Sequence, residues 1–560
     1  MKRITPALLL AVLTSLFASN AHAQAKWAKN AAKITFTLKT FSANGNLIGS
    51  CCGFYVGTDG EAVANFAPFK GASSAVVIDA NGVEQQVECI IGANDIYDVA
   101  KFKINAGKTQ PATIATTALQ KDNIAWLLPY AVKKTPEAIM GTIIRVEQPA
   151  DKYSYYTMQM QVPETAGGCP VLNDNGEVVG IMQQPTSGDK DGYATDVRMA
   201  TDLTAKQLMI NDPTLSQTMI KKALPDDIKD ATVTLLTAQT LVDANTLSSI
   251  IEDFIKKFPN SPEGYKHRAQ SHVKAGRYDD ADRDMQQAIK IGTELDDTYY
   301  NYARMVYSHQ LYEQPEKQYA PWTLELAEDA INKAHAQNPQ PLYSEIKAQI
   351  KFSQKQYAEA YDVYKQLIDN GKATAENYYG AARCKEQLGD SIAMLALLDS
   401  AIATFSEPYI RDAAPYFWAR AEARMSQGKM REAVHDLNIY EKLMPQVNDQ
   451  FYYIRFEAES KCRLFQQALN DIRKAISKND RNAFYYAEKA SLEIRVKLYD
   501  DAIDTAQQLI GLESENSDGY LFLGLAQCLN GDKATGTKNL EKAKQLGDTQ
   551  AQSLIEKYGK

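Results

Sequence analysis

The sequence predicts a multidomain protein in which an all-β region is followed by an all-α region, and three observations support this fold class. Between about residues 33 and 197, short runs of alternating apolar residues are separated by Asn-Gly, Asp-Gly and Gly-Asn turn signals, a pattern typical of antiparallel sandwiches or barrels. After residue 201 the apolar residues recur with the helical period. From residue 265 onward a helical motif returns at spacings that are most often 34 residues, which indicates a solenoid of stacked repeats.

Residues 1–23 have the features of a secretory signal peptide. Lys2 and Arg3 precede an apolar run (ALLLAVLTSLF), and the small-residue triplet AHA follows at residues 21–23. Such a segment is removed on export, so we expect a periplasmic or secreted protein that begins near Gln24. No later stretch is apolar for long enough to span a bilayer, and we therefore expect no membrane insertion.

Composition argues against nucleic-acid binding and against a metal centre. The chain has 61 basic and 69 acidic residues and a formal net charge of -8, whereas surfaces that bind nucleic acid are strongly basic. The cysteines show no CxxC spacing, and adjacent cysteines on an extended segment point to opposite faces. We therefore expect neither a zinc site nor another cofactor. In an oxidising compartment we expect a disulfide among Cys51, Cys52, Cys89 and Cys169, for example between Cys89 and one of the adjacent pair, with the connectivity left open.

Three segments of the β region point to one protein family. Residues 53–69 have the pattern of strand, turn and strand (GFYVGTDG, then AVANFAPF after one residue), residues 98–104 begin a strand with an aspartate (DVAKFKI), and residues 168–181 have the sequence GCPVLNDNGEVVGI. In order and separation, they resemble the regions around the three catalytic residues of trypsin-like serine proteases of the bacterial periplasmic type. The resemblance implies a trypsin-like double β-barrel over residues 24–205.

The resemblance also implies that this domain lacks its catalytic residues. Ala67 stands where the family has its histidine base, Asp98 matches the orienting acid, and Gly167 stands at the position of the serine, three residues before Pro170. Residues 24–205 contain no histidine, and a hydroxyl nucleophile needs a base within hydrogen-bonding reach. We therefore expect a pseudoenzyme with no catalytic residues, whose cleft retains the ability to bind an extended peptide as an added strand.

The alternative is an active serine- or cysteine-type endopeptidase with unconventional catalytic residues. Cys169 could replace the serine, although its thiol would lie two residues late in the loop, with no imidazole to lower its pKa. A lysine could serve as the base, but a Ser-Lys dyad would need a serine from elsewhere in the fold.

The repeat in the α region is defined by a small residue and by an aromatic residue four positions before it. The small position is occupied by Ala269, Ala303, Ala348, Ala382, Ala421, Phe456, Ala490 and Gly524. The aromatic position is occupied by Tyr265, Tyr299, Ser344, Tyr378, Phe417, Tyr452, Tyr486 and Tyr520. A second small position lies on the following helix. This pattern resembles the tetratricopeptide repeat (TPR), a helix-turn-helix unit in which small residues let the helices approach.

The resemblance to TPR proteins implies about eight repeats over residues 262–548. A helical linker with N-terminal capping helices is expected at 206–261, and a C-terminal capping helix at 549–560. In that family the first helix of each repeat lines a concave groove, where we expect Tyr300, Arg304, Tyr379, Arg383, Trp418 and Tyr453. Such groups would suit a peptide or helix with apolar anchors and a carboxylate; the alternative is that they pack against the next repeat.

Taken together, these features predict an exported, non-catalytic scaffold that binds proteins or peptides, as part of a cell-envelope complex. The partners would dock in the groove of the repeats and in the protease-like cleft.

Overall fold

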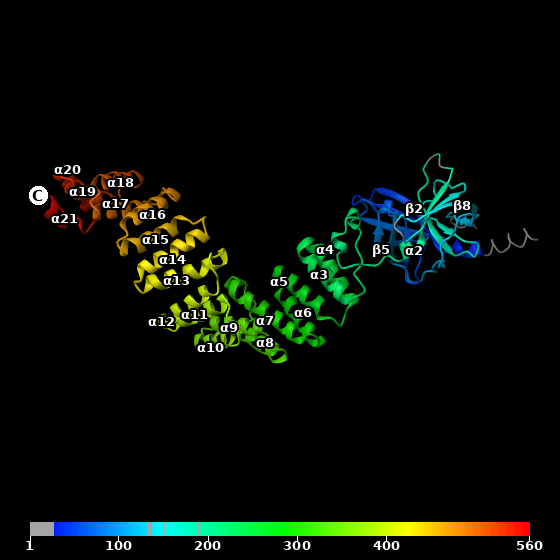
Figure 1. Cartoon of the computed structure of the whole chain (residues 1–560), viewed down its shortest axis with the longest axis horizontal. Coiled ribbons are helices and arrows are strands. Elements are labelled where there is room, and N and C mark those ends of the chain that lie inside the picture. Colours follow the sequence, from blue (N-terminus) through cyan, green and yellow to red (C-terminus); the bar gives the residue numbers. More distant parts are fainter. Residues whose placement is uncertain (1–26, 131–136, 150–151, 187, 189, 560) are drawn as a thin grey trace, which may run out of the picture. The chain divides into compact units, whose positions relative to one another are not determined.

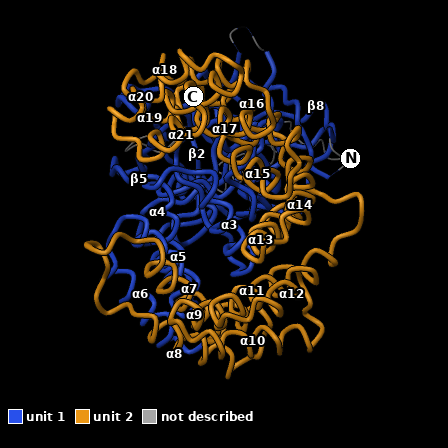
Figure 2. Tube along the Cα trace, turned by 90° about the vertical axis from the view of Figure 1, so that its left-hand side faces the viewer, with its two compact units in different colours: residues 1–293 blue, residues 294–560 orange. Residues whose placement is uncertain are grey.

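The computed structural model describes residues 27–130, 137–149, 152–186, 188 and 190–559. The predicted signal peptide, residues 1–23, lies outside the described residues. The chain divides into two compact units, residues 1–293 and 294–560 (Figure 2). The first unit contains all the β-strands of the described residues and the first helices of the α region, and the second unit contains helices.

The first barrel is a closed antiparallel sheet of six strands in the order β1-β2-β3-β6-β5-β4. Its strands are β1 (Thr35–Phe41), β2 (Leu47–Tyr55), β3 (Glu61–Ala64), β4 (Ser74–Asp79), β5 (Glu84–Asn94) and β6 (Val99–Ile104) (Figure 1). Asn-Gly and Asp-Gly pairs turn three of its hairpins, and Gly45, Gly60 and Gly82 there have positive φ angles. This left-handed conformation favours glycine, which is why the turn signals could be located in the sequence.

The second barrel is also closed, with the strand order β10-β11-β12-β9-β8-β7. Its strands are β7 (Ile124–Leu127), β8 (Ile139–Glu147), β9 (Tyr155–Gln159), β10 (Pro170–Leu172), β11 (Val178–Met182) and β12 (Gly192–Asp196). Strand β11 is buried along its whole length. This is expected for a strand that faces the interior of its own barrel on one side and the first barrel on the other. The predicted all-β double barrel is thus confirmed.

Residues 197–224 lead from the second barrel onto the first. The short helix α2 (Val197–Thr201) is followed by two 3-10 turns, η2 (Met209–Asn211) and η3 (Leu215–Gln217). The side chains of Met209, Leu215 and Ile220 belong to the apolar core of the first barrel. Beyond them, the Ile90 N–H donates to the carbonyl of Lys221 at 2.8 Å, so this segment extends the sheet beside β5. Part of the segment expected as a helical linker, residues 206–261, is therefore packed into the barrel.

Four helices complete the first unit. They are α3 (Ile228–Leu241), α4 (Ala244–Lys257), α5 (Pro262–Lys274) and α6 (Tyr278–Ile291). The side chains of Asp227, Asp243 and Ser261 accept hydrogen bonds from backbone N–H groups at the starts of α3, α4 and α5. These caps satisfy donors that have no partner within a helix, and they fix where each helix begins.

The second unit consists of helical hairpins followed by a last helix. The hairpins are α7 (Leu295–Tyr312) with α8 (Leu324–Gln337), α9 (Pro341–Ser353) with α10 (Tyr357–Asp369), α11 (Ala375–Gln387) with α12 (Ser391–Ala403), α13 (Ala414–Ser426) with α14 (Met430–Leu443), α15 (Asp449–Lys461) with α16 (Phe465–Lys478), α17 (Ala483–Arg495) with α18 (Tyr499–Leu512), and α19 (Ser517–Leu529) with α20 (Lys533–Gln545). The last helix is α21 (Ala551–Tyr558). Two short 3-10 turns, η4 (Pro315–Lys317) and η5 (Arg411–Ala413), lie in the connections.

The small residues predicted from the repeat lie where two helices of a hairpin meet. Within α19 and α20, a Cβ added to Gly524 would lie 2.7 Å from the carbonyl oxygen of Gly536. A Cβ added to Gly536 would lie 2.5 Å from the Sγ of Cys528. Ala303, Ala421 and the other alanines at the first position are likewise buried. The predicted all-α solenoid is confirmed, and its hairpins are compatible with the TPR pattern.

Candidate functional site

The loop before β10 holds the position at which the sequence resemblance expects a nucleophile. Its turn is closed by the Cys169 N–H, which donates to the carbonyl of Ala166 at 3.0 Å. On one side the Gly168 N–H donates to the carbonyl of Met182 in β11 at 2.8 Å. On the other side the Gly167 carbonyl accepts a hydrogen bond from the Cys52 N–H in β2 at 2.8 Å. The loop is therefore fixed between strands of both barrels.

Gly168 is required by this close approach. Its φ angle is +81°, and an added Cβ would lie 2.0 Å from the carbonyl oxygen of Cys52. No side chain fits so close to a backbone oxygen. The sequence analysis identified Gly167 but missed this role of Gly168, because the contact joins segments far apart in the chain.

Gly167 faces the side chain of Gln184. A Cβ added to Gly167 would lie 2.1 Å from the Gln184 Oε1, and the Gln184 Nε2 donates to the carbonyl of Glu164 at 2.9 Å. The amide of Gln184 thus occupies the space that a larger side chain at position 167 would need. Nothing in the sequence pattern indicated this residue.

Ala67 and Asp98 come together as the resemblance implied. Ala67 is the first residue of η1 (Ala67–Phe69), and its N–H donates to the Asp98 Oδ1 at 2.6 Å. Asp98 itself has a positive φ of 47°, a conformation that non-glycine residues rarely adopt and that often marks a functional position. Burial raises the pKa of the Asp98 carboxyl group above its ordinary value, although N–H groups of Ala67 and Phe66 oppose the shift.

Asn65 links this pair to the loop. Its Nδ2 donates to the backbone carbonyl of Asp98 at 3.2 Å, and its Oδ1 lies 3.2 Å from the place a Cβ on Gly168 would take. Asn65 is buried, and its Oδ1 has no hydrogen-bond partner among the described residues. The structure therefore brings the segment around Ala67 and the loop at Gly168 to one place.

Three thiols lie beside the same loop, and all are buried. Cys51 and Cys169 are 7% and 0% exposed, and Cys52 is 3% exposed. Burial raises the pKa of the Cys51 and Cys52 thiols well above the ordinary value, and contact with Cys169 raises that of Cys52 further. In this conformation Cys51 and Cys52 are held as thiols rather than thiolates.

Neither a metal site nor a membrane span stands out in the described part of the chain. Across residues 27–559 with their gaps, no three His, Cys, Asp or Glu side chains are grouped so as to hold a metal ion. No described helix combines the length and the apolar composition needed to cross a bilayer.

In the second unit, the aromatic residues predicted to line a groove contact the following repeat. Ring centroids are 5.1 Å apart for Tyr300 and Tyr343, and 5.7 Å apart for Tyr379 and Tyr416. In each pair, the residue after the aromatic position of one repeat meets the residue before that position in the next. Trp418 with Phe451 (6.2 Å) and Tyr453 with Tyr485 (5.5 Å) follow the same rule. These side chains therefore join consecutive repeats.

The predicted arginines also rest on aromatic rings. The guanidinium of Arg304 lies 5.5 Å from the centroid of Tyr300, and that of Arg383 lies 4.6 Å from the centroid of Phe352. Arg383 nevertheless keeps an exposed face. With Tyr379, Glu386, Met394 and Glu422 it lines a cavity of about 520 Å³ between α11, α12 and α13. Of the six predicted binding residues, Tyr379 and Arg383 lie at this cavity.

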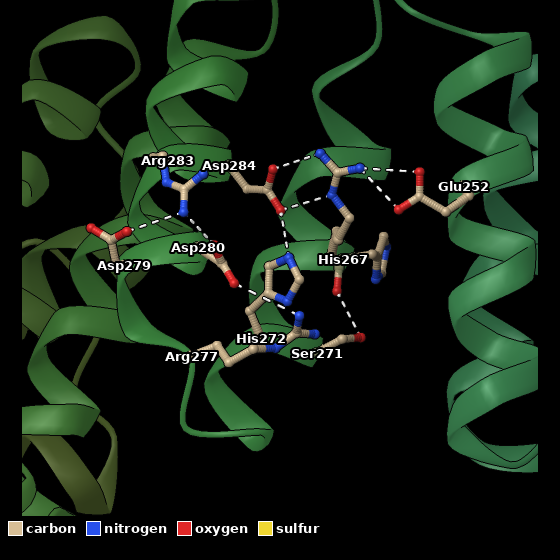
Figure 3. Close-up of polar contacts among 10 residues, drawn as sticks. Glu252, His267, Ser271, His272, Arg277, Asp279, Asp280, Arg283 and Asp284 are labelled. Carbon is tan, nitrogen blue, oxygen red and sulfur yellow. Dashed lines mark hydrogen bonds and ion pairs between the residues drawn. The ribbon is translucent and has the colours of Figure 1, made fainter.

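A buried ion pair recurs in the repeats, and the sequence analysis did not identify it. The Nε and one terminal nitrogen of Arg268 in α5 bind the two carboxylate oxygens of Asp284 in α6, at 2.9 and 2.8 Å. The same arginine reaches Glu252 of α4 at 2.9 Å. Figure 3 shows the carboxylates of Asp284 and Glu252 on opposite sides of the guanidinium that joins them, with His272 beside Asp284.

The same arrangement occurs twice in the second unit, with the same separation of 16 residues. Arg420 binds Asp436 through two contacts, at 2.7 and 3.0 Å, and Arg455 binds Asp471 at 2.6 and 3.1 Å. Arg420 also contacts Asp399 of the preceding hairpin at 2.7 Å, and Arg455 contacts Glu441 at 2.7 Å. Each arginine therefore joins the second helix of its own repeat to the second helix of the repeat before.

Comparison with known proteins supports the fold of the first unit. A family model described as "Trypsin-like peptidase domain" matches residues 51–181, a range that includes Ala67, Asp98 and Gly167. Among solved structures, the chain is similar to "Crystal structure of Rv3671c protease from M. tuberculosis, active form", with 14% identity and a TM-score of 0.28. That likeness covers 32% of this chain and 83% of the other. No curated protein matches the chain.

The family match contradicts the expectation of a pseudoenzyme, because a trypsin-like peptidase domain points toward a protease. That expectation was based on the side chains at Ala67 and Gly167 and on the lack of histidine in residues 24–205. The match instead extends over 51–181, which includes strands of both barrels and the loop between them.

Proposed function

We propose that the chain is an endopeptidase with unconventional catalytic residues, which acts on polypeptides at the loop of residues 163–170. The family match over residues 51–181 carries this proposal. The two closed barrels and the loop between them support it, because trypsin-like folds place their chemistry at the junction of two such barrels.

Cys169 is the nucleophile in this proposal, since it carries the thiol of the loop. Its Sγ would attack the carbonyl carbon of the scissile peptide, the amine would leave with a proton, and water would hydrolyse the thioester. Cys169 is fully buried in the structure. The proposal therefore requires the loop to move outward when a substrate binds.

Asp98 is the acid-base group in this proposal. Residues 24–205 contain no imidazole, and the proposal gives this role to the carboxylate that the family resemblance places at the site. The burial that raises the pKa of Asp98 makes its carboxylate a stronger base and its acid form more populated near neutral pH.

The backbone of the loop supplies a donor for the substrate. Gly167 is buried, and within the described ranges its N–H donates to no acceptor. An N–H beside the reacting carbonyl stabilises the oxyanion that forms during attack.

For the α region we propose a TPR array that docks polypeptides, which are delivered to the barrels as substrates or held as partners in an envelope complex. The cavity lined by Tyr379 and Arg383 supports this role. Export to the periplasm or beyond, which rests on the signal peptide, belongs to the same proposal.

Incubation of the full chain with unfolded casein, in the presence of dithiothreitol to keep its thiols reduced, tests the peptidase. The parent should cleave casein, and Cys169→Ala and Asp98→Asn should each reduce kcat by at least about 100-fold. Cys384→Ala, a buried cysteine of the second unit, and Asp95→Asn, an exposed neighbour of Asp98, are the matched controls and should keep full activity. If the parent leaves casein intact, or if Cys169→Ala cleaves as fast as the parent, the proposal fails.

Binding of the same substrate to Cys169→Ala tests the array. Tyr379→Ala with Arg383→Ala should weaken the Kd for casein by about tenfold or more. Tyr312→Ala removes a tyrosine that is 84% exposed and lies outside the cavity, and should leave the Kd unchanged. Equal Kd values for both variants would exclude this cavity as the docking site.

A further inference from the structure

The four cysteines of the β region do not lie together. Cys51 and Cys52 are adjacent on β2, and their side chains enter different cores. Cys51 packs with the core of the first barrel, whereas Cys52 packs in the same apolar cluster as Cys169, with Met158 and Leu127. The alternation of side chains along a strand explains this separation, and it selects Cys52 as the neighbour of Cys169.

The backbone holds this pair in place. The Cys52 N–H donates to the carbonyl of Gly167 at 2.8 Å, and the Cys169 carbonyl accepts from the Met182 N–H at 2.9 Å. The tight contact of Gly168 against the Cys52 carbonyl lies between them. Cys52 and Cys169 belong to one apolar cluster, and burial together with the nearness of Cys169 raises the pKa of the Cys52 thiol. The two cysteines are thus neighbours in one core, on backbone segments that are hydrogen-bonded to each other.

Cys89 has other surroundings. It lies on β5 at the wall of a cavity of about 430 Å³, together with Lys103, Lys221 and Asp253. It belongs to neither of the two apolar clusters that contain the other three cysteines. The sequence analysis gave as an example a disulfide between Cys89 and either Cys51 or Cys52. The structure does not favour that pairing.

We propose that Cys52 and Cys169 form a disulfide bond that ties the loop before β10 to strand β2. A small-molecule disulfide such as oxidised glutathione is the oxidant. The thiolate of one cysteine attacks it and one glutathione thiolate leaves. The second cysteine then attacks this mixed disulfide and the second glutathione leaves. Two electrons pass from the cysteine pair to glutathione, and the two thiol protons are released to the glutathione thiolates or to solvent.

Burial of the two thiols determines at which stage of folding the disulfide forms. Both thiols are shielded from solvent in the folded chain, and the reactive species in exchange is the thiolate. The bond therefore forms while the chain folds, and the folded, reduced protein reacts slowly. Once formed, it joins two segments that are distant in sequence, so it restricts the unfolded chain strongly.

A second consequence rests on the proposed function. With Cys169 in a disulfide, its thiol cannot attack a peptide bond, so the peptidase would be inactive until a reductant opens the bridge. The bond would then act as a redox switch on the same loop.

Refolding the full chain tests the disulfide. The denatured, reduced protein is refolded in a glutathione redox buffer, its free thiols are titrated under denaturing conditions, and its peptides are mapped by mass spectrometry without reduction. Of the seven thiols of the chain, five should remain, and one cross-linked peptide should contain Cys52 and Cys169. The oxidised protein should melt at a Tm at least about 5 °C above that of the reduced protein.

Two sets of variants assign the bridge. Cys51→Ser and Cys89→Ser should retain the cross-link, and Cys51→Ser also separates the adjacent pair in the peptide map. Cys52→Ser and Cys169→Ser should lose it. Should either of these fail to fold, the map of Cys51→Ser decides alone. Seven free thiols after refolding, or a cross-link that uses Cys51 or Cys89, would overturn the proposal.

Casein cleavage with and without dithiothreitol separates this inference from the proposed function. Cleavage only after reduction supports the switch. Cleavage by the fully oxidised protein excludes both the switch and Cys169 as the nucleophile, but leaves the disulfide in place. No cleavage in either state, with the cross-link present, means that the peptidase proposal fails while the disulfide stands.

Discussion

The barrels and the helical repeats bring backbone segments together by different means. In the repeats, small residues at regular positions allow helices to approach, and the alanines of this pattern, such as Ala303 and Ala421, are fully buried. In the barrels, the closest approach depends on a single residue, Gly168, whose added Cβ would lie 2.0 Å from a backbone oxygen. A requirement that recurs at a fixed spacing can be detected in one sequence, whereas a contact between segments far apart in the chain cannot.

The two regions also differ in what their packed interfaces contain. The core that holds the loop before β10 is apolar, with two cysteines among its members. The repeats place fully or nearly fully buried carboxylates, Asp436 and Asp471, between their helices, and each is bound by an arginine. A repeat interface therefore depends on charge pairing as well as on small residues.

The largest expected effect comes from adding a side chain at Gly168, where the loop before β10 meets strand β2. Gly168→Ala should destabilise the first unit by more than about 5 kcal/mol, because the new Cβ meets the Cys52 carbonyl and the φ angle is positive. The control is Gly82→Ala, which also has a positive φ but no atom within 4 Å of the new Cβ, and should cost about 1 kcal/mol. Urea denaturation monitored by near-UV circular dichroism measures both. Similar losses would show that the contact is not tight.

The next largest effect is expected from removing a buried carboxylate at an interface between repeats. Asp436→Ala should cost about 3–5 kcal/mol, because it leaves the guanidinium groups of Arg420 and Arg424 without their buried partner. Asp399→Ala removes a carboxylate on the exposed side of Arg420 and should cost less than about 1 kcal/mol. Thermal denaturation monitored by helical circular dichroism compares them, and an equal loss of Tm in both would contradict the role of the buried pair.

A smaller effect is expected from the aromatic contacts between repeats. Trp418→Ala removes contacts with Tyr440 and Phe451 and should cost about 2–3 kcal/mol. Ile392→Ala, at a side chain that is 82% exposed, should change the free energy of unfolding by less than about 0.5 kcal/mol. If Trp418→Ala lowers casein binding without lowering Tm, the tryptophan serves the groove rather than the interface.

The smallest effect depends on pH. Glu459 is 3% exposed, and burial together with Asp471 raises its pKa to about 8. In the unfolded chain its pKa falls to the ordinary value of 4.5, so the folded state binds more protons between these two values. Its contribution to stability is therefore present at low pH and is lost as pH rises toward 8.

Glu459→Gln removes this dependence. The variant should be more stable than the parent by about 1 kcal/mol at pH 8, and the difference should shrink toward pH 5. Glu541→Gln, at an exposed position, is the control and should show no such trend. A variant that is less stable than the parent at pH 8 would mean that the carboxylate of Glu459 is ionised and bound in the fold.

The difference between the repeats and the barrels also explains which parts of the fold could be predicted from the sequence. The double barrel and the solenoid follow from turn glycines, such as Gly60, and from the repeated small positions, all of which are local or periodic. The meeting of Ala67 with Asp98 was implied by resemblance. The position of Gln184 over Gly167 left no pattern to detect. The sequence pointed to a disulfide among four cysteines, but only the structure shows that Cys52 and Cys169 share one core.

One missed feature and one wrong prediction show where the information in the sequence was incompletely used. The arginines one residue before the small position and the aspartates 16 residues later, as in Arg455 and Asp471, were visible in the sequence, but they occur in separate repeats and do not run through the array. The expectation of a pseudoenzyme was based on Ala67, Gly167 and the lack of histidine in residues 24–205, and the family match over residues 51–181 contradicts it.

The arginines that join consecutive hairpins have a mechanical consequence. Arg420 holds carboxylates of α12 and α14, and Arg455 holds carboxylates of α14 and α16, so α14 is fastened on both sides. When a chain is pulled from its ends, a hairpin without such ion pairs to its neighbours can detach alone. The helices from α13 to α16 would instead resist extension together and rupture in one large step.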